Sequence, residues 1–280
     1  MDIRLNDARI LVTGANSGIG AATTTALLTR GAEVIATVRT RSAAASVRRA
    51  HAGESVTVAI LDVNDEAAAR KIIDRYHPDV VVNCAGDARL GALMDLDDDQ
   101  AREQFETLVI APIRLARFAV PHQRAAGNGR IVNVSSTMGS TPLPFTGWYG
   151  AAKAALDVAT DALRLELGPT GITVIRVECG AVDSPAWDTA GDDVEAGADE
   201  VTQSSRHRWV ALTRWARPHF ATTAEVATVI ADAALDDDPE PVYRVGFGST
   251  IPVVSSLVPT AVTDMITRAL FGLRLDRRSR

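Results

Sequence analysis

The sequence predicts an α/β fold in which helices cover both faces of a doubly wound parallel sheet. Three observations predict it. Short apolar runs alternate with helical segments from residue 8 to residue 180. The runs are strand-like and apolar, as expected for strands that are buried on both faces. A glycine-rich turn separates the first apolar run from the first helical segment.

The first strand is expected at residues 8–12, an apolar run that ends in Thr13-Gly14. A helix over residues 19–30 follows and stops at Gly31. Further strands, rich in β-branched residues, are expected at residues 33–38, 56–61, 80–82, 131–134, 172–177 and 242–247. Further helices are expected at residues 66–76, 100–119, 149–167 and 222–235. This order predicts a Rossmann-type fold with three αβα layers. Without a repeat or a linker, it also predicts one domain over residues 1–280.

The pattern changes after residue 180. Residues 183–200 hold seven acidic residues and no lysine or arginine, and residues 206–217 hold four arginines. This stretch is too irregular for a sheet layer, so we expect an inserted lid over roughly residues 184–222. A C-terminal extension over roughly residues 248–280 contains an amphipathic helix at 259–273. We expect this helix to close the pocket or cap the body rather than to contact a membrane surface.

Composition excludes several classes of protein. The formal net charge of -6 over 280 residues gives no electrostatic case for nucleic-acid binding. The N-terminus has no apolar run, so no signal peptide is expected, and no stretch is long and apolar enough for a transmembrane segment. The two cysteines and five histidines lack metal-ligand spacing, so no metal is expected. The default location is the cytoplasm.

The glycine-rich turn predicts a dinucleotide site. Backbone amides at a helix N-terminus can face a pyrophosphate, and glycines allow close approach. The residues expected to bind the cofactor here are Gly14, Asn16, Ser17, Gly18, Ile19 and Gly20.

The end of the second strand bears on the choice of cofactor. An acidic residue that would bind the ribose diol is missing, and the strand ends in Val38-Arg39-Thr40-Arg41. A guanidinium pairs with a 2′-phosphate, whereas a carboxylate would repel it. NADP(H) is therefore favoured, with Arg39 as the main contact, and NAD(H) remains the alternative. The competing interpretation is that Arg39 and Arg41 are simple solvated charges in a loop.

Four motifs together resemble the classical short-chain dehydrogenase/reductase family. They are the turn at residues 13–20, Asn83-Cys84-Ala85-Gly86, Ser136, and Tyr149-Gly150-Ala151-Ala152-Lys153. Their order and spacing also match, over roughly residues 6–250. Residues 151–182 are most similar to the branch that acts on hydroxysteroids, retinoids and similar lipophilic alcohols and ketones. The resemblance implies an oxidoreductase that acts as a homodimer or homotetramer.

The Tyr149–Lys153 pair carries the expected chemistry. The two residues are four apart on one helix, so both side chains point to the same side. An ammonium near a phenol favours the phenolate and lowers the tyrosine pKa. By resemblance, Tyr149 is the acid/base, Lys153 its tuner and ribose ligand, and Ser136 the anchor of the substrate oxygen. The chain has only two lysines and three tyrosines, so a chance pair is improbable.

The resemblance also implies further cofactor contacts. Asp62 and Val63 correspond to the pair that contacts the adenine. Asn83, Ala85 and Gly86 correspond to the loop after the fourth strand, and Val182 and Ser184 to the residues that bind the carboxamide.

Two positions depart from the family pattern. Leu108 stands where the family has the asparagine of its catalytic tetrad. Leucine cannot bind the water that links the lysine to solvent, so the proton relay differs or turnover is slow. Cys179 replaces a proline, and one strand of the family's order 3-2-1-4-5-6-7 separates it from Cys84. No disulfide is therefore expected between them.

An apolar substrate pocket is expected around Met138, Phe145 and Trp187, next to Ser136 and Tyr149. The alternative is that these side chains only pack the lid or an oligomer interface. The favoured function is NADP(H)-dependent interconversion of a small lipophilic ketone and its secondary alcohol. The alternatives are an NAD-dependent oxidative alcohol dehydrogenase and a cofactor-binding regulatory homologue that has lost turnover.

Overall fold

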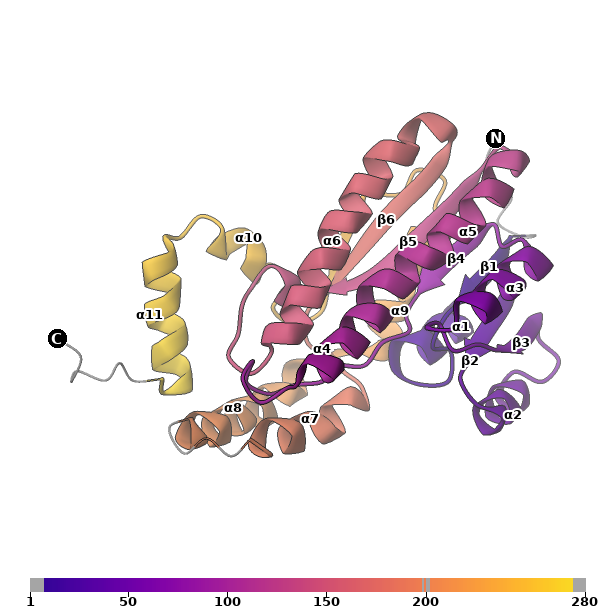
Figure 1. Cartoon of the computed structure of the whole chain (residues 1–280). Helices are drawn as coiled ribbons and strands as arrows, with labels where there is room; N and C mark the ends of the chain where they lie inside the picture. The colour runs from indigo at the N-terminus through magenta and orange to yellow at the C-terminus, as the bar shows by residue number, and fades with distance from the viewer. Residues whose placement is uncertain (1–7, 198, 200–201, 274–280) are drawn as a thin grey trace.

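A seven-stranded parallel sheet forms the centre of the computed structural model, which describes residues 8–197, 199 and 202–273 (Figure 1). Its strand order is β3-β2-β1-β4-β5-β6-β9. The strands are β1 (Arg9–Val12), β2 (Glu33–Val38), β3 (Val56–Ile60), β4 (Val80–Asn83), β5 (Gly129–Ser136), β6 (Ile172–Cys179) and β9 (Val242–Val245). Predicted fold class and strand order are both confirmed, and each expected strand is present to within a few residues.

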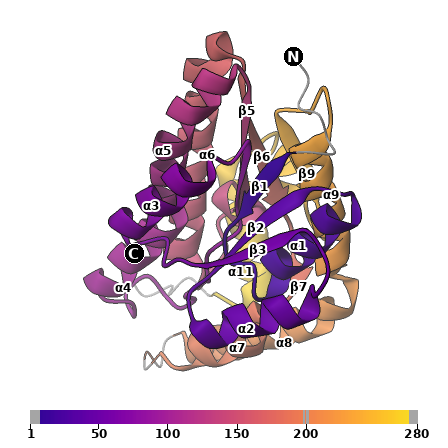
Figure 2. The ribbon, with the colours of Figure 1, turned by 90° about the vertical axis from the view of Figure 1, so that its right-hand side faces the viewer.

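Helices cover both faces of the sheet, as the apolar runs predict (Figure 2). One core cluster joins the sheet to α1 (Gly18–Thr29), α2 (Arg41–Ala50) and α9 (Thr223–Leu235). A second cluster joins the opposite face to α3 (Glu66–Tyr76), α5 (Ala111–Ala126) and α6 (Gly147–Leu167). Because helices cover both faces of the parallel sheet, the loops that follow the strands lie together at its carboxyl edge.

The central strand β1 pairs with both β2 and β4, so the chain reverses its direction of sheet growth there. Such a switch point brings two loops together at the carboxyl edge. The Thr13 hydroxyl oxygen accepts hydrogen bonds from the amides of Cys84 (3.0 Å) and Ala85 (2.9 Å). This threonine therefore ties the turn after β1 to the loop after β4.

The predicted helix over residues 100–119 is present within a longer helical stretch, but its hydrogen-bonding pattern is not regular throughout. The structure has α4 (Asp98–Phe105), a π-helical turn at Glu106–Ile110, and then α5. Pro112 has no amide hydrogen for the carbonyl of Leu108, so regular α-helical pairing is interrupted at this point. Helix α2 also lies where no helix was predicted, and the Thr40 hydroxyl caps it by accepting from the Ala43 amide (3.2 Å).

The lid region is more regular than its composition suggests. It contains α7 (Ala186–Glu195) and α8 (Gln203–Ala216), and a two-stranded sheet of β7 (Val182–Asp183) and β8 (Ala221–Thr222) holds its base. Arg206 on α8 is fully buried and donates to the Val194 carbonyl (2.8 Å) and to Asp95 (2.7 Å). One buried guanidinium thus joins both lid helices to the loop after β4.

The C-terminal helices α10 (Ile251–Ser255) and α11 (Thr260–Phe271) project from the body (Figure 1). Only the end of α11 packs on the lid, where Phe271 is 6% exposed. The predicted apolar face of α11 is exposed instead, and Ile266 is 56% exposed, so the expectation that this face caps the body is wrong. Arginines 274, 277, 278 and 280 lie outside the described residues. In the described ranges, no helix has the length and hydropathy to cross a bilayer.

Candidate active site

The glycine-rich turn follows β1 and leads into α1. Gly14 (φ +68°) and Gly18 (φ +51°) adopt left-handed conformations that other residues rarely take. A Cβ at Gly20 would overlap the Gly14 carbonyl oxygen, so the turn is closed tightly by the backbone itself. Ala15 is fixed from the other side, because its amide donates to the Thr37 carbonyl (3.0 Å). The conformation of the turn is therefore held by contacts within the chain itself.

The N-terminus of α1 fits an anionic cofactor. Its N-cap residue Ser17 makes no side-chain capping bond, and the first turn carries no acidic residue. Helices α3, α4 and α9 are each capped by a side chain, whereas α6, α7 and α8 are, like α1, without such a cap. The first amides of α1 are thus left for a pyrophosphate, which the helix dipole also favours. Asn16 and Ser17 are exposed at this end, and a Cβ at Gly18 would lie 3.8 Å from the Ser184 Cβ, at van der Waals distance.

The next strands place Arg39 and Asp62 on the same edge. Val38 and Ile60 pair at the ends of β2 and β3. Arg39 directly follows β2, Asp62 lies two residues after the end of β3, and both side chains are exposed. Asp62 accepts from the Asn64 amide (3.0 Å), and Val63 beside it is buried. Arg39 forms no ion pair with any residue of the described ranges. It is therefore free to meet a phosphate, and the residues present fit a dinucleotide with a 2′-phosphate.

A buried chain of amides lies behind the cofactor loop. The Asn83 side chain donates to the Asn133 oxygen (2.8 Å), and the Asn133 side chain donates to the Thr160 hydroxyl (2.9 Å). This chain links β4, β5 and α6. It fixes the strand end from which the loop at Ala85 and Gly86 begins.

Leu108 is near the loop that follows β4. It is buried in the π-helical turn, and a Cβ at Gly86 would overlap its Cδ2 atom. A leucine therefore occupies the space beside the cofactor loop. The side chain of residue 108 has no polar group to offer the lysine.

Ser136, Tyr149 and Lys153 come together at the end of β5 and the start of α6. Ser136 is the last residue of β5, and its hydroxyl accepts from the Met138 amide (3.2 Å). The Lys153 ammonium lies 5.8 Å from the centroid of the Tyr149 ring and donates to the Val134 carbonyl (2.9 Å). The three side chains predicted to be catalytic thus form one constellation.

The tyrosine pKa differs from the expectation. Burial raises the pKa of Tyr149 to about 12, although the nearby Ser136 hydroxyl works in the opposite direction. The net lowering expected from Lys153 is not found, because burial of the phenol is the largest influence on its pKa. Tyr149 is therefore a neutral phenol at neutral pH, ready to donate a proton.

The lid side of the site is apolar. Phe145 is buried, and Leu143, Tyr149 and Trp187 pack against the same cluster. Trp187 also stacks on Trp209 of α8, with ring centroids 6.2 Å apart. Tyr149 thus borders a hydrophobic wall. Val182 is buried in β7 and Ser184 follows it, both at the carboxyl edge.

Met138 lines a groove beside this wall, between the loop after β5 and α6. Gly150, Ala151 and Ala154 also line the groove, and Leu143 is shared between the groove and the wall. The residues that line this groove do not include Tyr149. Met138 is therefore less well placed for substrate than Phe145 and Trp187.

Several residues that shape the site were not in the predicted set. Thr13 and Thr37 fix the glycine-rich turn, since the Thr37 hydroxyl also donates to the Val12 carbonyl (3.2 Å). Arg206 lies 5.2 Å from the Phe145 ring and supports it from the lid. Asp157 follows Lys153 by one helical turn, and that spacing was the signal available in the sequence.

The cysteines are free, as predicted. Burial raises the pKa of Cys84 and of Cys179 to about 12, so both are neutral thiols. The described part of the chain contains no group of three His, Cys, Asp or Glu side chains that could hold a metal ion.

The fold and this constellation define a Rossmann-type oxidoreductase that uses a nicotinamide dinucleotide. The family model for short chain dehydrogenase matches residues 8–195, and the chain belongs to the short-chain dehydrogenase/reductase family. The chain is 35% identical over 194 residues to an uncharacterized oxidoreductase, YusZ, of Bacillus subtilis (strain 168), covering 66% of this chain and 69% of that protein. It is 30% identical to a 3-amino-tetrahydro-pyrrolizinone reductase of Xenorhabdus hominickii, covering 85% and 86% of the two chains.

Other relatives and solved structures agree with this assignment. An NADPH-dependent 3-dehydrocapnine reductase of Ornithobacterium rhinotracheale is 29% identical, with 64% of this chain and 67% of that protein covered. A short-chain dehydrogenase from Streptomyces avermitilis has a TM-score of 0.76 at 27% identity, covering 95% and 97% of the chains. A short chain dehydrogenase from Burkholderia cenocepacia J2315, solved with NADP, has the same fold (TM-score 0.73, 23% identity, 98% and 100% covered).

Proposed function

We propose that this oxidoreductase uses NADPH to reduce a small lipophilic ketone to its secondary alcohol, with Tyr149 as the proton donor. One observation carries the proposal: Tyr149 is a neutral phenol between the Ser136 hydroxyl and an apolar wall. A phenol of high pKa is in the form needed to protonate a developing alkoxide. The apolar wall favours a substrate whose carbonyl is its main polar group.

Each residue of the constellation has a defined task. The Ser136 hydroxyl and the Tyr149 phenol both hydrogen-bond to the carbonyl oxygen of the substrate. When bound, the nicotinamide supplies a hydride to the carbonyl carbon. Tyr149 gives its proton to the oxygen as negative charge forms there, and the Lys153 ammonium stabilises the phenolate that remains. A proton from solvent then restores the phenol.

The preference for NADPH rests on Arg39. It is an exposed cation without an ion-pair partner among the described residues, at the edge where a 2′-phosphate would lie. The use of NADPH by the Ornithobacterium relative supports this preference.

The resemblance of residues 151–182 to the hydroxysteroid and retinol branch supports a hydrophobic ketone. Exposed Val158 and Leu165 on the outer side of α6 support a homodimer or homotetramer.

The test is a panel of hydrophobic ketones and alcohols, assayed in both directions with both cofactors. We expect NADPH-linked ketone reduction, and tighter binding of NADPH than of NADH in a fluorescence titration. Tyr149→Phe should lower kcat by about 10²- to 10⁴-fold and leave NADPH binding nearly unchanged, because only the proton donor is lost. Tyr243→Phe is the matched control and should keep the wild-type rate.

The pH dependence has a definite sign. Oxidation of the alcohol needs the phenolate, so its rate should rise with pH from neutral towards about 12. Reduction needs the phenol and should not gain from higher pH. A Tyr149→Phe variant with full activity, or tighter binding of NADH, would contradict the proposal, as would a panel without any turnover.

A further inference from the structure

Lys153 is a buried cation whose charge needs a partner. It is only 8% exposed, and burial lowers its pKa. The ionisable groups that face it are Tyr149, Cys84, Cys179 and Asp157. The pKa of the tyrosine and of both thiols is raised to about 12, so these three are uncharged at neutral pH. Asp157 is the one group in this set that can be negative there.

Asp157 stands on the same face of α6, one turn beyond Lys153. It is 5% exposed, and its Oδ1 atom has no hydrogen-bond partner among the described residues. Burial raises the pKa of Asp157 to about 6, against the lowering effects of the nearby Ser135 hydroxyl, of Arg176 and, more weakly, of the Lys153 ammonium. The carboxyl is therefore mostly ionised at neutral pH. A buried carboxylate oxygen without a partner is costly, which calls for a reason to keep it.

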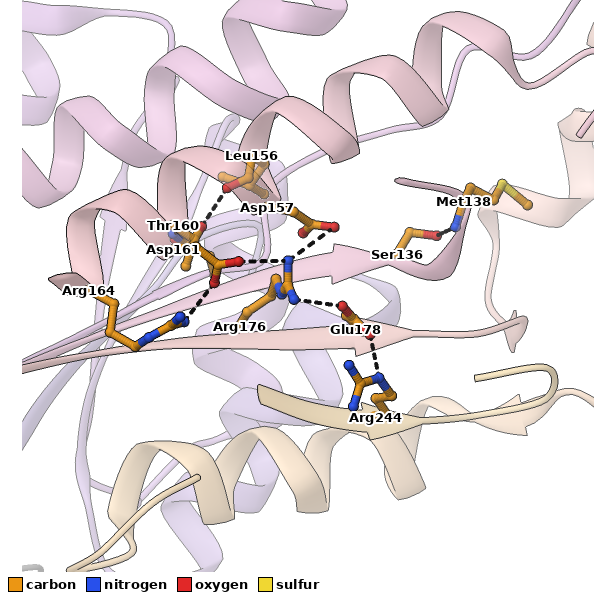
Figure 3. Close-up of polar contacts among 11 residues, drawn as sticks. Ser136, Met138, Leu156, Asp157, Thr160, Asp161, Arg164, Arg176, Glu178 and Arg244 are labelled. Atoms are coloured by element: carbon orange, nitrogen blue, oxygen red, sulfur yellow. Dashed lines mark hydrogen bonds and ion pairs between the residues drawn. The ribbon is translucent and has the colours of Figure 1, made fainter. Parts of the chain in front are cut away.

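Asp157 also forms an ion pair with Arg176 on β6, but two other carboxylates lie closer to this guanidinium (Figure 3). Its guanidinium lies 3.0 Å from Glu178, 3.4 Å from Asp161 and 3.6 Å from Asp157. Glu178 also accepts from Arg244 (2.7 Å). Of these three carboxylates, Asp157 is therefore the farthest from the Arg176 guanidinium. Asp161 has its own cation as well, because Arg164 donates to it (2.6 Å).

We propose that Asp157 is a positioning residue whose negative charge, one helical turn away and not in direct ion-pair contact, keeps the ammonium of Lys153 charged. This role takes the place of the polar contact that Leu108 cannot make. The line of charges from Asp157 through Arg176 and Glu178 to the partly exposed Arg244 then joins the buried lysine to the surface. Its benefit for catalysis rests on the proposed function, since a charged Lys153 stabilises the phenolate of Tyr149.

The scarcity of lysine makes the test direct. Protein grown on ¹³C-lysine gives signals from only two side chains, Lys71 and Lys153. Lys71 is exposed and serves as an internal reference. Asp157→Asn should lower the pKa of Lys153 by about 1 pH unit or more, because a charge about one helical turn away is removed. The matched control is Asp161→Asn, one turn further along α6 and also in contact with Arg176, which should leave the pKa of Lys153 unchanged.

Two further measurements keep the test decisive if Asp157→Asn folds poorly. Asp157→Glu should restore most of the wild-type pKa of Lys153. In the wild type, the Lys153 signal should show an inflection near pH 6, as Asp157 takes up its proton, and the Lys71 signal should not. The same Lys153 pKa in Asp157→Asn and wild type, or a Lys153 signal without that inflection, would overturn the proposal. Since these readouts need neither cofactor nor turnover, a failed ketone panel would reject the proposed reaction without affecting this result.

Discussion

The sheet and the C-terminal helices treat similar apolar side chains in opposite ways. Ile131 in the middle of β5 is fully buried between two helical layers. Ile266 on α11 belongs to an equally apolar stripe and is mostly exposed, because that helix touches the body only at its end. Amphipathic patterning therefore shows that a helix has an apolar face, but it does not show that the chain supplies a surface to cover it.

The lid lies between these extremes. Its helices do bury apolar side chains, yet their attachment depends on a few polar contacts, above all those of Arg206. In the sheet, by contrast, strands are held both by pairing with neighbouring strands and by packing in two core clusters. The three regions should therefore respond very differently to comparable substitutions.

The largest effect is expected in the sheet. Ile131→Ala should lower the free energy of unfolding by about 2–5 kcal/mol, because it leaves a cavity in a region that cannot collapse. Denaturant unfolding monitored by circular dichroism measures this. A loss below about 1 kcal/mol would mean that the sheet is packed less tightly than its difference from the C-terminal helices implies.

An intermediate effect is expected in the lid. Arg206→Met leaves the Val194 carbonyl and the Asp95 carboxylate without their donor, at a cost of about 1–3 kcal/mol. Hydrogen exchange should increase mainly in α7 and α8. Arg214→Met, an exposed change on the same helix, should leave exchange as it is. Equal effects of the two variants would remove the special role of Arg206.

The smallest effect is expected on α11. Ile266→Ala, the same substitution as in β5, should change the free energy of unfolding by no more than about 0.5 kcal/mol, since the side chain is already in water. The same denaturant titration measures it. A loss comparable to that of Ile131→Ala would show that this face is covered in solution and would break the comparison.

Strand pairing also explains which parts of the site were predictable. Residues that follow strands or share a helix face, such as Ser136, Tyr149 and Lys153, are placed by regular geometry that a sequence encodes locally. The burial of Arg206 and the raised pKa of Tyr149 depend on contacts between distant segments. Those contacts leave no periodic pattern, so they appeared only in the structure.

The raised thiol pKa of the two cysteines has a practical consequence for labelling. With a pKa of about 12, each is a thiolate in roughly one molecule in 10⁵ at neutral pH, and only the thiolate reacts with alkylating reagents. A single cysteine placed on the exposed face of α11, as in Met265→Cys, would therefore be alkylated far faster than either native thiol. The chain is thus ready for site-specific probes on its projecting helix without removal of its own cysteines.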